Sequence, residues 1–334
     1  MGFLFGKKSG GKQRRLFYAT DLHGSERTFR KFLNAGKFYN VDTLIMGGDI
    51  IGKVAIPIID EGGGKYRATL QGTTEHPETE EDRKKLIERI ETLGFYHKVM
   101  TEDEFKHTTS DQKHIDALFH ELAKERLMQW AELAATRLDG TGIRCFVTGG
   151  NDDYPDVLEA LPHQKTGDEP MVNCEGDLVN IDDEHTMISL GWSTPTPWDT
   201  PREVSDEKLG EMIDELLTKV TDMDHCIFNF HDPPVDSTLD TCPKLDWDTD
   251  PPSPIMVGGQ MVMFGAGSIS VRKAIEERQP MLGVHGHIHE SQGMVRIGRT
   301  VCINPGSEYG EGVLRGCILT YKNGQVDGFQ MTAG

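Results

Sequence analysis

Five short stretches of the sequence end in side chains that bind divalent cations. They are Asp21-Leu22-His23, Gly47-Gly48-Asp49, Gly150-Asn151-Asp152-Asp153, His231 and Gly286-His287-Ile288-His289. Each follows an apolar run that is typical of a β-strand. Side chains at the ends of strands gather along one edge of a sheet, so the five stretches indicate one shared site. Mixed imidazole and carboxylate ligation suits Mn, Fe or Zn better than Ca.

The spacing within the stretches indicates a site for two adjacent cations. Asp21 and His23 are two residues apart, which in an extended segment directs both side chains to one side, and His287 and His289 repeat this spacing. Asp49 stands where a strand gives way to a loop, so its two oxygens can bridge two ions. The amide oxygen of Asn151 ligates without adding negative charge. Paired metal sites hold their ions about 3.5–4 Å apart.

In their order along the chain, the stretches resemble the motifs of the calcineurin-like metallophosphoesterases: D-x-H, G-D, G-N-x, H and G-H-x-H. The resemblance runs from Asp21 to His289 and so covers most of the chain. It implies a four-layer α/β/β/α sandwich and two divalent cations. The implied ligands of the first cation are Asp21, His23, Asp49 and His289; those of the second are Asp49, Asn151, His231 and His287, with Asp49 as the bridge.

The sequence departs from this pattern at Asp152, where many similar proteins carry a histidine that protonates the leaving group. A carboxyl with an ordinary pKa of about 3.9 is a poor general acid at neutral pH unless burial or a neighbouring carboxylate raises that pKa. This favours esters whose leaving group needs little protonation. Asp153 and Asp232 are candidates for orienting the ligating imidazoles.

The resemblance implies a hydrolase that acts on a small phosphodiester or phosphomonoester. A hydroxide shared by the two cations would attack phosphorus in line with the departing oxygen. The residues expected to act in catalysis are Asp49, Asn151, Asp152 and His231. No serine or cysteine nucleophile is evident, and a covalent intermediate is not needed.

Strand-like and helix-like segments alternate along the chain, which predicts an α/β layered fold. Ser25 is the expected N-cap of a first helix. After the second strand, residues 53–113 form an insertion with a hairpin around Gly62-Gly63-Gly64, and we expect it to act as a cap beside the cations. Two helices are expected over 80–93 and 111–138. The segments between 294 and 331 are expected to form a β-meander that closes a second sheet.

Composition bounds the function further. The chain has 334 residues and a formal charge of −19, which disfavours extended nucleic acid as a substrate. The six cysteines are dispersed without a C-x-x-C pair and are expected to be reduced core residues. Residues 1–14 are expected to be a flexible tail before a single domain over 15–334, and the apolar part of this tail is too short for a signal peptide or a membrane span. We therefore expect a cytoplasmic protein that makes no membrane contact.

Two other functions stay open at this point. One is a nuclease with the same motifs, and the other is a non-catalytic metal-binding scaffold. The oligomeric state is open as well, with a homo-oligomer as one option. The segment from Trp192 to Trp198 is either an aromatic wall that faces the substrate or a stiff loop.

Overall fold

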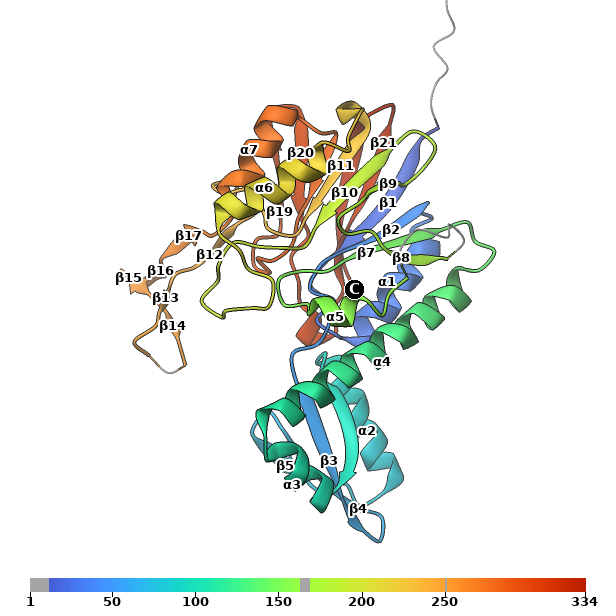
Figure 1. Cartoon of the computed structure of the whole chain (residues 1–334), viewed down its shortest axis with the longest axis vertical. Helices are drawn as coiled ribbons and strands as arrows, with labels where there is room; N and C mark the ends of the chain where they lie inside the picture. The colour runs from blue at the N-terminus through green and yellow to red at the C-terminus, as the bar shows by residue number, and fades with distance from the viewer. Residues whose placement is uncertain (1–11, 163–168, 250) are drawn as a thin grey trace, which may run out of the picture.

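Two six-stranded sheets face each other in the computed structural model, which describes residues 12–162, 169–249 and 251–334 (Figure 1). Residues 1–11 of the expected tail lie outside the described residues, and Arg14 already belongs to the first strand. Among the residues described, no helix combines the length and the apolar character needed to cross a membrane.

The first sheet has the strand order β22-β21-β1-β2-β7-β8. Four of its strands run parallel, and β21 and β22 pair antiparallel at the β1 side. The bounds are β1 Arg14–Ala19, β2 Thr43–Gly47, β7 Arg144–Thr148, β8 Met171–Asn173, β21 Arg315–Lys322 and β22 Gln325–Ala333.

The second sheet has the order β19-β20-β18-β11-β10-β9. Its four central strands are parallel, and an antiparallel strand lies at each edge. The bounds are β9 Leu178–Asn180, β10 Thr186–Leu190, β11 Cys226–Phe230, β18 Leu282–Val284, β19 Gly293–Ile297 and β20 Thr300–Asn304.

Alternating side chains of the strands create the layers. In β1, Leu16 and Tyr18 pack with residues of the second sheet, whereas Phe17 and Ala19 pack against helices on the outer side. A separate apolar cluster joins the outer face of the second sheet to its own helices. The outer helices are α1 Glu26–Phe38, α4 Gln112–Leu138 and α5 Pro155–Leu158 on the first sheet, and α6 Asp206–Leu217 and α7 Ile269–Arg278 on the second. The expected order of layers, helix, sheet, sheet, helix, is confirmed.

The C-terminal strands do not form one meander, contrary to the sequence-based expectation. β19 and β20 join the second sheet, but β21 and β22 join the first. Both faces of β21 are buried, because Ile318 packs outward and Leu319 packs between the sheets. A run of apolar residues without alternation does not specify which sheet the strand enters.

Residues 55–109 form a lobe with its own four-stranded sheet and apolar core, below the main body in Figure 1. The sequence correctly indicated the glycine-turned hairpin and the first helix, but it missed β6 and α3. The elements are β3 Ala55–Gly62, β4 Lys65–Leu70, β5 Thr73–Glu75, α2 Glu80–Thr92, β6 Tyr96–Thr101 and α3 Glu102–Thr109. The role of residues 53–113 as a cap stays a prediction.

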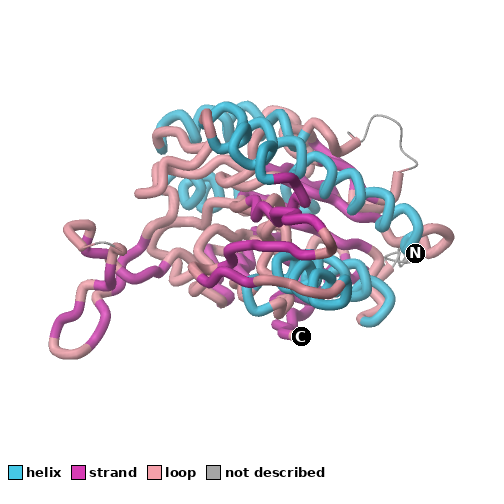
Figure 2. The backbone as a smooth tube through the Cα atoms, turned by 90° about the horizontal axis from the view of Figure 1, so that it is seen from below, coloured by secondary structure: helices cyan, strands magenta, loops and turns pink. Residues whose placement is uncertain are grey.

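Three short two-stranded ribbons form an arm that projects from the body (Figures 1 and 2). The arm spans residues 241–265, of which residue 250 is not described. Its strands are β12 Thr241–Pro243, β13 Leu245–Asp246, β14 Ser253–Pro254, β15 Met256–Val257, β16 Gln260–Met261 and β17 Met263–Gly265. The described residues also include two short 3-10 helices, η2 Met223–His225 and η3 Tyr309–Glu311.

Ser25 occupies the N-cap position of α1, as expected, but its side chain makes no capping hydrogen bond. Its hydroxyl donates instead to the carbonyl oxygen of Thr92 at 2.7 Å. The buried hydroxyl therefore connects the start of α1 to the end of α2, and the main body to the lobe.

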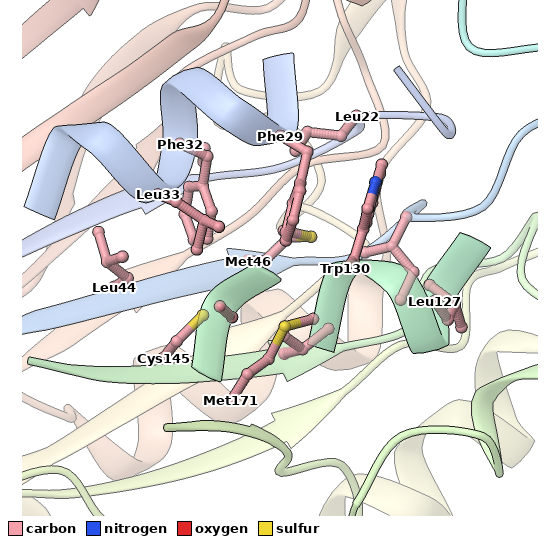
Figure 3. Packing of buried hydrophobic residues seen from close by; sticks show 14 of the residues in the cluster. Leu22, Phe29, Phe32, Leu33, Leu44, Met46, Leu127, Trp130, Cys145 and Met171 are labelled. Carbon is pink, nitrogen blue, oxygen red and sulfur yellow. The ribbon is translucent and has the colours of Figure 1, made fainter. Parts of the chain in front are cut away.

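An aromatic stack joins α1 to α4 (Figure 3). The rings of Phe29 and Trp130 lie 4.0 Å apart at an interplanar angle of 5°. The Trp130 indole also donates to a carboxylate oxygen of Glu26 at 2.6 Å. The indole thus combines apolar burial with a satisfied polar group, which is the arrangement that a buried tryptophan needs.

Trp130→Ala is expected to lower the free energy of unfolding by about 3–5 kcal/mol, because it leaves a large cavity and removes the indole hydrogen bond to Glu26. Met128→Ala is the matched control on the same helix, since Met128 is 54% exposed. Urea unfolding followed by circular dichroism measures both. Equal stability of the two variants would contradict this account of the α1–α4 packing.

Candidate metal centre

The motifs come together where the parallel strands of both sheets end. Asp21 and Asp49 each follow their strands, β1 and β2, by two residues, Asn151 lies three residues beyond β7, and His231 comes directly after β11. His287 lies three residues beyond β18. The carboxyl ends of parallel strands in each sheet share one edge, so the fold places segments far apart in sequence in a single site.

One group consists of Asp21, His23, Asp49 and His289. Each offers one ligand atom, and these atoms all lie within 4.8 Å of one another. The Nε2 atoms of His23 and His289 are 3.2 Å apart, and His289 Nε2 is 3.4 Å from Asp21 Oδ1. The group is buried apart from the partly exposed His289.

A second group adjoins the first. Asn151 Oδ1 lies 3.1 Å from His231 Nε2 and 2.7 Å from His287 Nδ1. Asp49 Oδ1 is 3.5 Å from His231 Nε2, while its Oδ2 is 3.6 Å from His23 Nε2. The structure therefore brings all seven expected ligands together, with Asp49 between the two groups.

The backbone of the site is not extended, contrary to the expectation from the spacing of Asp21 and His23. Asp21, His23, Asp49 and His287 all have φ between 42° and 67°, in the left-handed region. This region is uncommon for residues other than glycine and costs about 1–3 kcal/mol per residue. The side chains of Asp21 and His23 therefore converge through tight turns. Such strain is often found at functional sites, where the surrounding structure maintains it.

Main-chain hydrogen bonds hold these turns. The Asp21 amide donates to the carbonyl of Gly48, and the His23 amide donates to the carbonyl of Asp49, both at 2.9 Å. The Ser307 hydroxyl donates to the carbonyl of Asp21 at 2.6 Å. The first two motifs are thus one bonded unit, closed by a residue near the C-terminus.

Two glycines allow the close approach of the ligand side chains. A Cβ at Gly48, where φ is +124°, would lie 2.3 Å from His231 Nδ1. A Cβ at Gly150 would lie 2.1 Å from Asp49 Oδ1. Neither contact is sterically possible, so both positions require glycine for space, and Gly48 requires it for its backbone conformation as well.

Opposing charges dominate the electrostatics of the buried site. Burial alone would raise the pKa of Asp21, but His289 and His231 outweigh it and lower the pKa to about 2. Burial would likewise lower the pKa of His231, but Asp49 and Asp21 outweigh it and raise the pKa to about 10. Burial, assisted by His231, lowers the pKa of His287 to about 4. These shifts pair the ionised carboxylate of Asp21 with a protonated His231, beside the neutral imidazole of His287.

This set of donors fits divalent cations. Carboxylate oxygens, imidazole nitrogens and amide oxygens are ligands of metals such as Mn, Fe and Zn. The inward-facing atoms of His23 and His289 oppose each other at 3.2 Å, an arrangement that a cation between them would stabilise. The cluster is a candidate metal site, and its residues do not specify the number or identity of the ions.

Asp153 and Asp232 were expected to orient the ligating imidazoles, but their carboxylates accept hydrogen bonds from other groups. The Asp153 carboxylate accepts from the amides of Ile50, Ile51 and Gly150 at 2.7–3.1 Å and so joins the loops that carry Asp49 and Asn151. The Asp232 carboxylate accepts from Thr194. Burial raises the pKa of each carboxyl to about 7. A main-chain oxygen orients an imidazole instead, because His231 Nδ1 lies 3.0 Å from the carbonyl of Gly47.

Two further residues at the site were missed by the sequence reasoning. Lys53 Nζ forms a 2.6 Å ion pair with Asp152, whose carboxylate lies 3.7 Å from His23 Nδ1. The ring of Tyr309 lies 4.5 Å from that of His23 and 5.9 Å from that of His289. Only the closeness of Lys53 to Asp49 in sequence could have indicated it, and no sequence signal indicates Tyr309.

The environment of Asp152 differs from that of an exposed carboxyl. Burial raises its pKa, Asp49 raises it further, and Lys53 opposes both effects. Its main-chain amide donates to Asp49 Oδ1 at 3.0 Å. Asp152 therefore contacts Asp49 of the candidate metal centre through its main-chain amide, and its side chain pairs with the ammonium group of Lys53.

Comparison with known proteins shows that this chain shares its fold with solved structures. No family model matches the chain. The uncharacterized protein MJ1162 of Methanocaldococcus jannaschii is 28% identical over 158 residues, which make up 47% of this chain and 61% of that protein. One crystal structure aligns with 97% of this chain and 99% of its own, with a TM-score of 0.55 and 14% identity. The crystal structure of TT1561 of Thermus thermophilus aligns with 93% of this chain and 99% of its own, with a TM-score of 0.50 and 11% identity.

The matched part of the chain thus spans about three-fifths of the length of the archaeal relative, and the likeness to the two crystal structures concerns the fold. The motifs, the layered α/β architecture and the buried cluster of Asp and His together resemble the calcineurin-like metallophosphoesterases.

Gly48→Ala is expected to displace His231 and to weaken Mn²⁺ binding by at least about 10-fold, the lower range for disturbed ligand orientation. Gly63→Ala is the matched control, because Gly63 also has a positive φ, of +65°, but has no neighbour within 4 Å of the added carbon. Isothermal titration with Mn²⁺ compares the two variants. Equal affinity would show that Gly48 is not needed for space.

Proposed function

We propose that this protein is a metal-dependent phosphoric ester hydrolase that binds two divalent cations and acts on a small phosphodiester or phosphomonoester. The observation that carries the proposal is the convergence of seven buried or partly buried donor side chains where the parallel strands of the two sheets end, with the two oxygens of Asp49 directed to different groups. This arrangement supports Asp49 as the ligand shared by both cations.

Divalent cations at such a site supply Lewis-acid stabilisation of the phosphoryl group and lower the pKa of water. The residues of the chain hold these cations and exclude bulk solvent. Asp21 and Asp49 provide buried negative charge, and Asn151 presents its oxygen to the site while its amide nitrogen donates to Thr200 Oγ1 at 2.9 Å. Pre-organised donors of this kind do not need to rearrange when charge develops in the reaction.

Asp152, at the sequence position where the calcineurin-like pattern has a histidine, forms an ion pair with Lys53 beside the donor cluster. Burial would lower the pKa of Lys53, but Asp152 outweighs it and raises the pKa, so Lys53 stays an ammonium ion at neutral pH. We infer that Lys53 stabilises the negative charge of a phosphoryl or leaving-group oxygen electrostatically and does not transfer a proton. Esters with good leaving groups are then the favoured substrates.

The nuclease alternative has less support than a small-molecule esterase. The formal charge of −19 repels a polyanion at long range. A purely scaffolding role would not require the strained backbone and the sterically restricted glycines at the donor cluster. Both features favour a site that binds cations in a defined geometry.

Asp49→Ala is expected to abolish Mn²⁺-dependent hydrolysis of p-nitrophenyl phosphate and bis-p-nitrophenyl phosphate while the protein stays folded, because both groups lose a shared ligand. The rates on the two esters distinguish a monoesterase from a diesterase. Asp183→Ala, which removes an exposed carboxylate, serves as the control. Full turnover in the Asp49 variant would exclude the bridging role, and a wild-type protein inactive on both esters would favour the scaffold.

Lys53→Met is expected to lower kcat/KM by about 10-fold or more, the usual loss when a hydrogen bond to a charged group is removed. Lys53→Arg should retain most of the rate because it keeps the charge. Lys98→Met is the matched control, since Lys98 also pairs with a carboxylate, that of Glu121, but in the lobe. A rate in Lys53→Met equal to that of the control would argue against a role for this cation.

A further inference from the structure

The loop of residues 192–203 connects the candidate metal centre to an exposed tryptophan. Thr200 Oγ1 accepts the hydrogen bond from Asn151, and the amide of Arg202 donates to the carbonyl of Asn151 at 3.1 Å. At the other end of the loop, Thr194 donates twice to Asp232, the neighbour of His231. The loop is therefore attached to two of the segments that carry candidate ligands.

Internal bonds fix the shape of this loop. The Glu203 carboxylate accepts from Thr196 Oγ1 at 2.5 Å, from the Thr200 amide at 3.0 Å and from Thr200 Oγ1 at 2.6 Å. Pro195 and Pro197 restrict φ on both sides of Thr196. The backbone of this loop is thus held in place before any ligand binds, which reduces the entropic cost of binding.

The two tryptophans of the loop differ in their surroundings. Trp192 is partly buried against the core of the second sheet, and the guanidinium of Arg202 lies 5.3 Å from its ring centre. Trp198 is 67% exposed and meets only one other indole, that of Trp247, at 6.0 Å in an edge-to-face arrangement. Trp247 belongs to the projecting arm and is 47% exposed. Large exposed aromatic side chains on a rigid support are typical of binding surfaces.

The position of Trp198 suits a ligand that is also bound at the metal centre. Trp198 precedes Thr200 by two residues, so their Cα atoms are at most about 7 Å apart. The hydroxyl of Thr200 is in turn 2.9 Å from the side chain of Asn151. An ester with its phosphoryl group at the metal centre could therefore place a second group against the indoles.

The charges around the indoles limit what this second group can be. Asp199 follows Trp198, and Asp246 and Asp248 flank Trp247. These carboxylates repel a further phosphate, so they disfavour a polynucleotide. A planar, uncharged ring satisfies both the aromatic surface and the local negative charge, since every nucleobase has a face that stacks on an aromatic side chain.

We propose that Trp198 and Trp247 form a subsite for the nucleobase of a nucleoside phosphoester, the phosphoryl group of which is bound at the metal centre. This inference rests on the proposed hydrolase function and specifies its substrate class.

The test compares two diesters that share one leaving group: thymidine 5′-(p-nitrophenyl phosphate), which has a base, and methyl p-nitrophenyl phosphate, which does not. Trp198→Ala and Trp247→Ala should each raise KM for the thymidine ester by about 5-fold or more, within the range measured for single base–aromatic stacks. Neither should change kcat, nor either constant for the methyl ester. Phe38→Ala is the matched control, because Phe38 is a 79% exposed ring at the end of α1, next to the amino ends of the strands.

Further measurements separate failure of the subsite from failure of the hydrolase function. Quenching of tryptophan fluorescence by thymidine 5′-monophosphate should require about 5-fold more nucleotide in Trp198→Ala than in the wild type, and this readout needs no turnover. Wild-type protein that hydrolyses neither ester would overturn the hydrolase proposal, while the fluorescence titration would still test the subsite. Unchanged quenching and KM in both variants, or equal effects on the two esters, would overturn the subsite. A dimer that dissociates in the tryptophan variants, seen by light scattering, would instead assign the indoles to contacts between copies of the chain.

Discussion

The structure of the site depends on compensating the negative charge of carboxylates that are buried away from water. Asp21 and Asp49 are buried, and an isolated carboxylate in such a place would be strongly destabilised. Imidazoles within 3.4–3.6 Å compensate part of this charge, and cations bound between the two groups would compensate it more fully. The remaining features of the site place these groups close together. Gly48 and Gly150 provide space, the left-handed turns direct the side chains inward, and Asp153 joins the loops that carry Asp49 and Asn151.

The two packed sheets are what make this concentration of charge possible. The apolar faces of the strands form three layers of core, two beneath the outer helices and one between the sheets. Local strain at four ligand residues can persist because these cores and the main-chain bonds between motifs maintain it. Stability and function are thus separated in space: the strand interiors supply apolar burial, and the strand ends carry the polar groups.

Several residues other than the seven candidate ligands add charged and aromatic groups to the molecule. Lys53, at the start of the excursion after β2, provides a fixed positive charge beside Asp152. Trp198 and Trp247 come from a braced loop and from the projecting arm. These residues lie outside the strands and helices of the two packed sheets. They are the part of the molecule in which substrate preference would be encoded, because they do not share in holding the cations.

The sequence alone determined the seven donor residues, the alternation of strands and helices, and the order of layers, because each rests on local patterns: motif spacing, strand ends and apolar periodicity. It did not predict the left-handed backbone of Asp21 and His23, since hydrogen bonds to Gly48 and Asp49 in another strand segment impose it. It also could not assign β21 to the first sheet, because both faces of that strand are buried. Lys53, Tyr309 and the pairing of Trp198 with Trp247 were decided only by tertiary structure, because each involves residues far apart in sequence or lacks a characteristic spacing. Local patterns specified which groups form the candidate metal centre, and long-range packing specified what surrounds them.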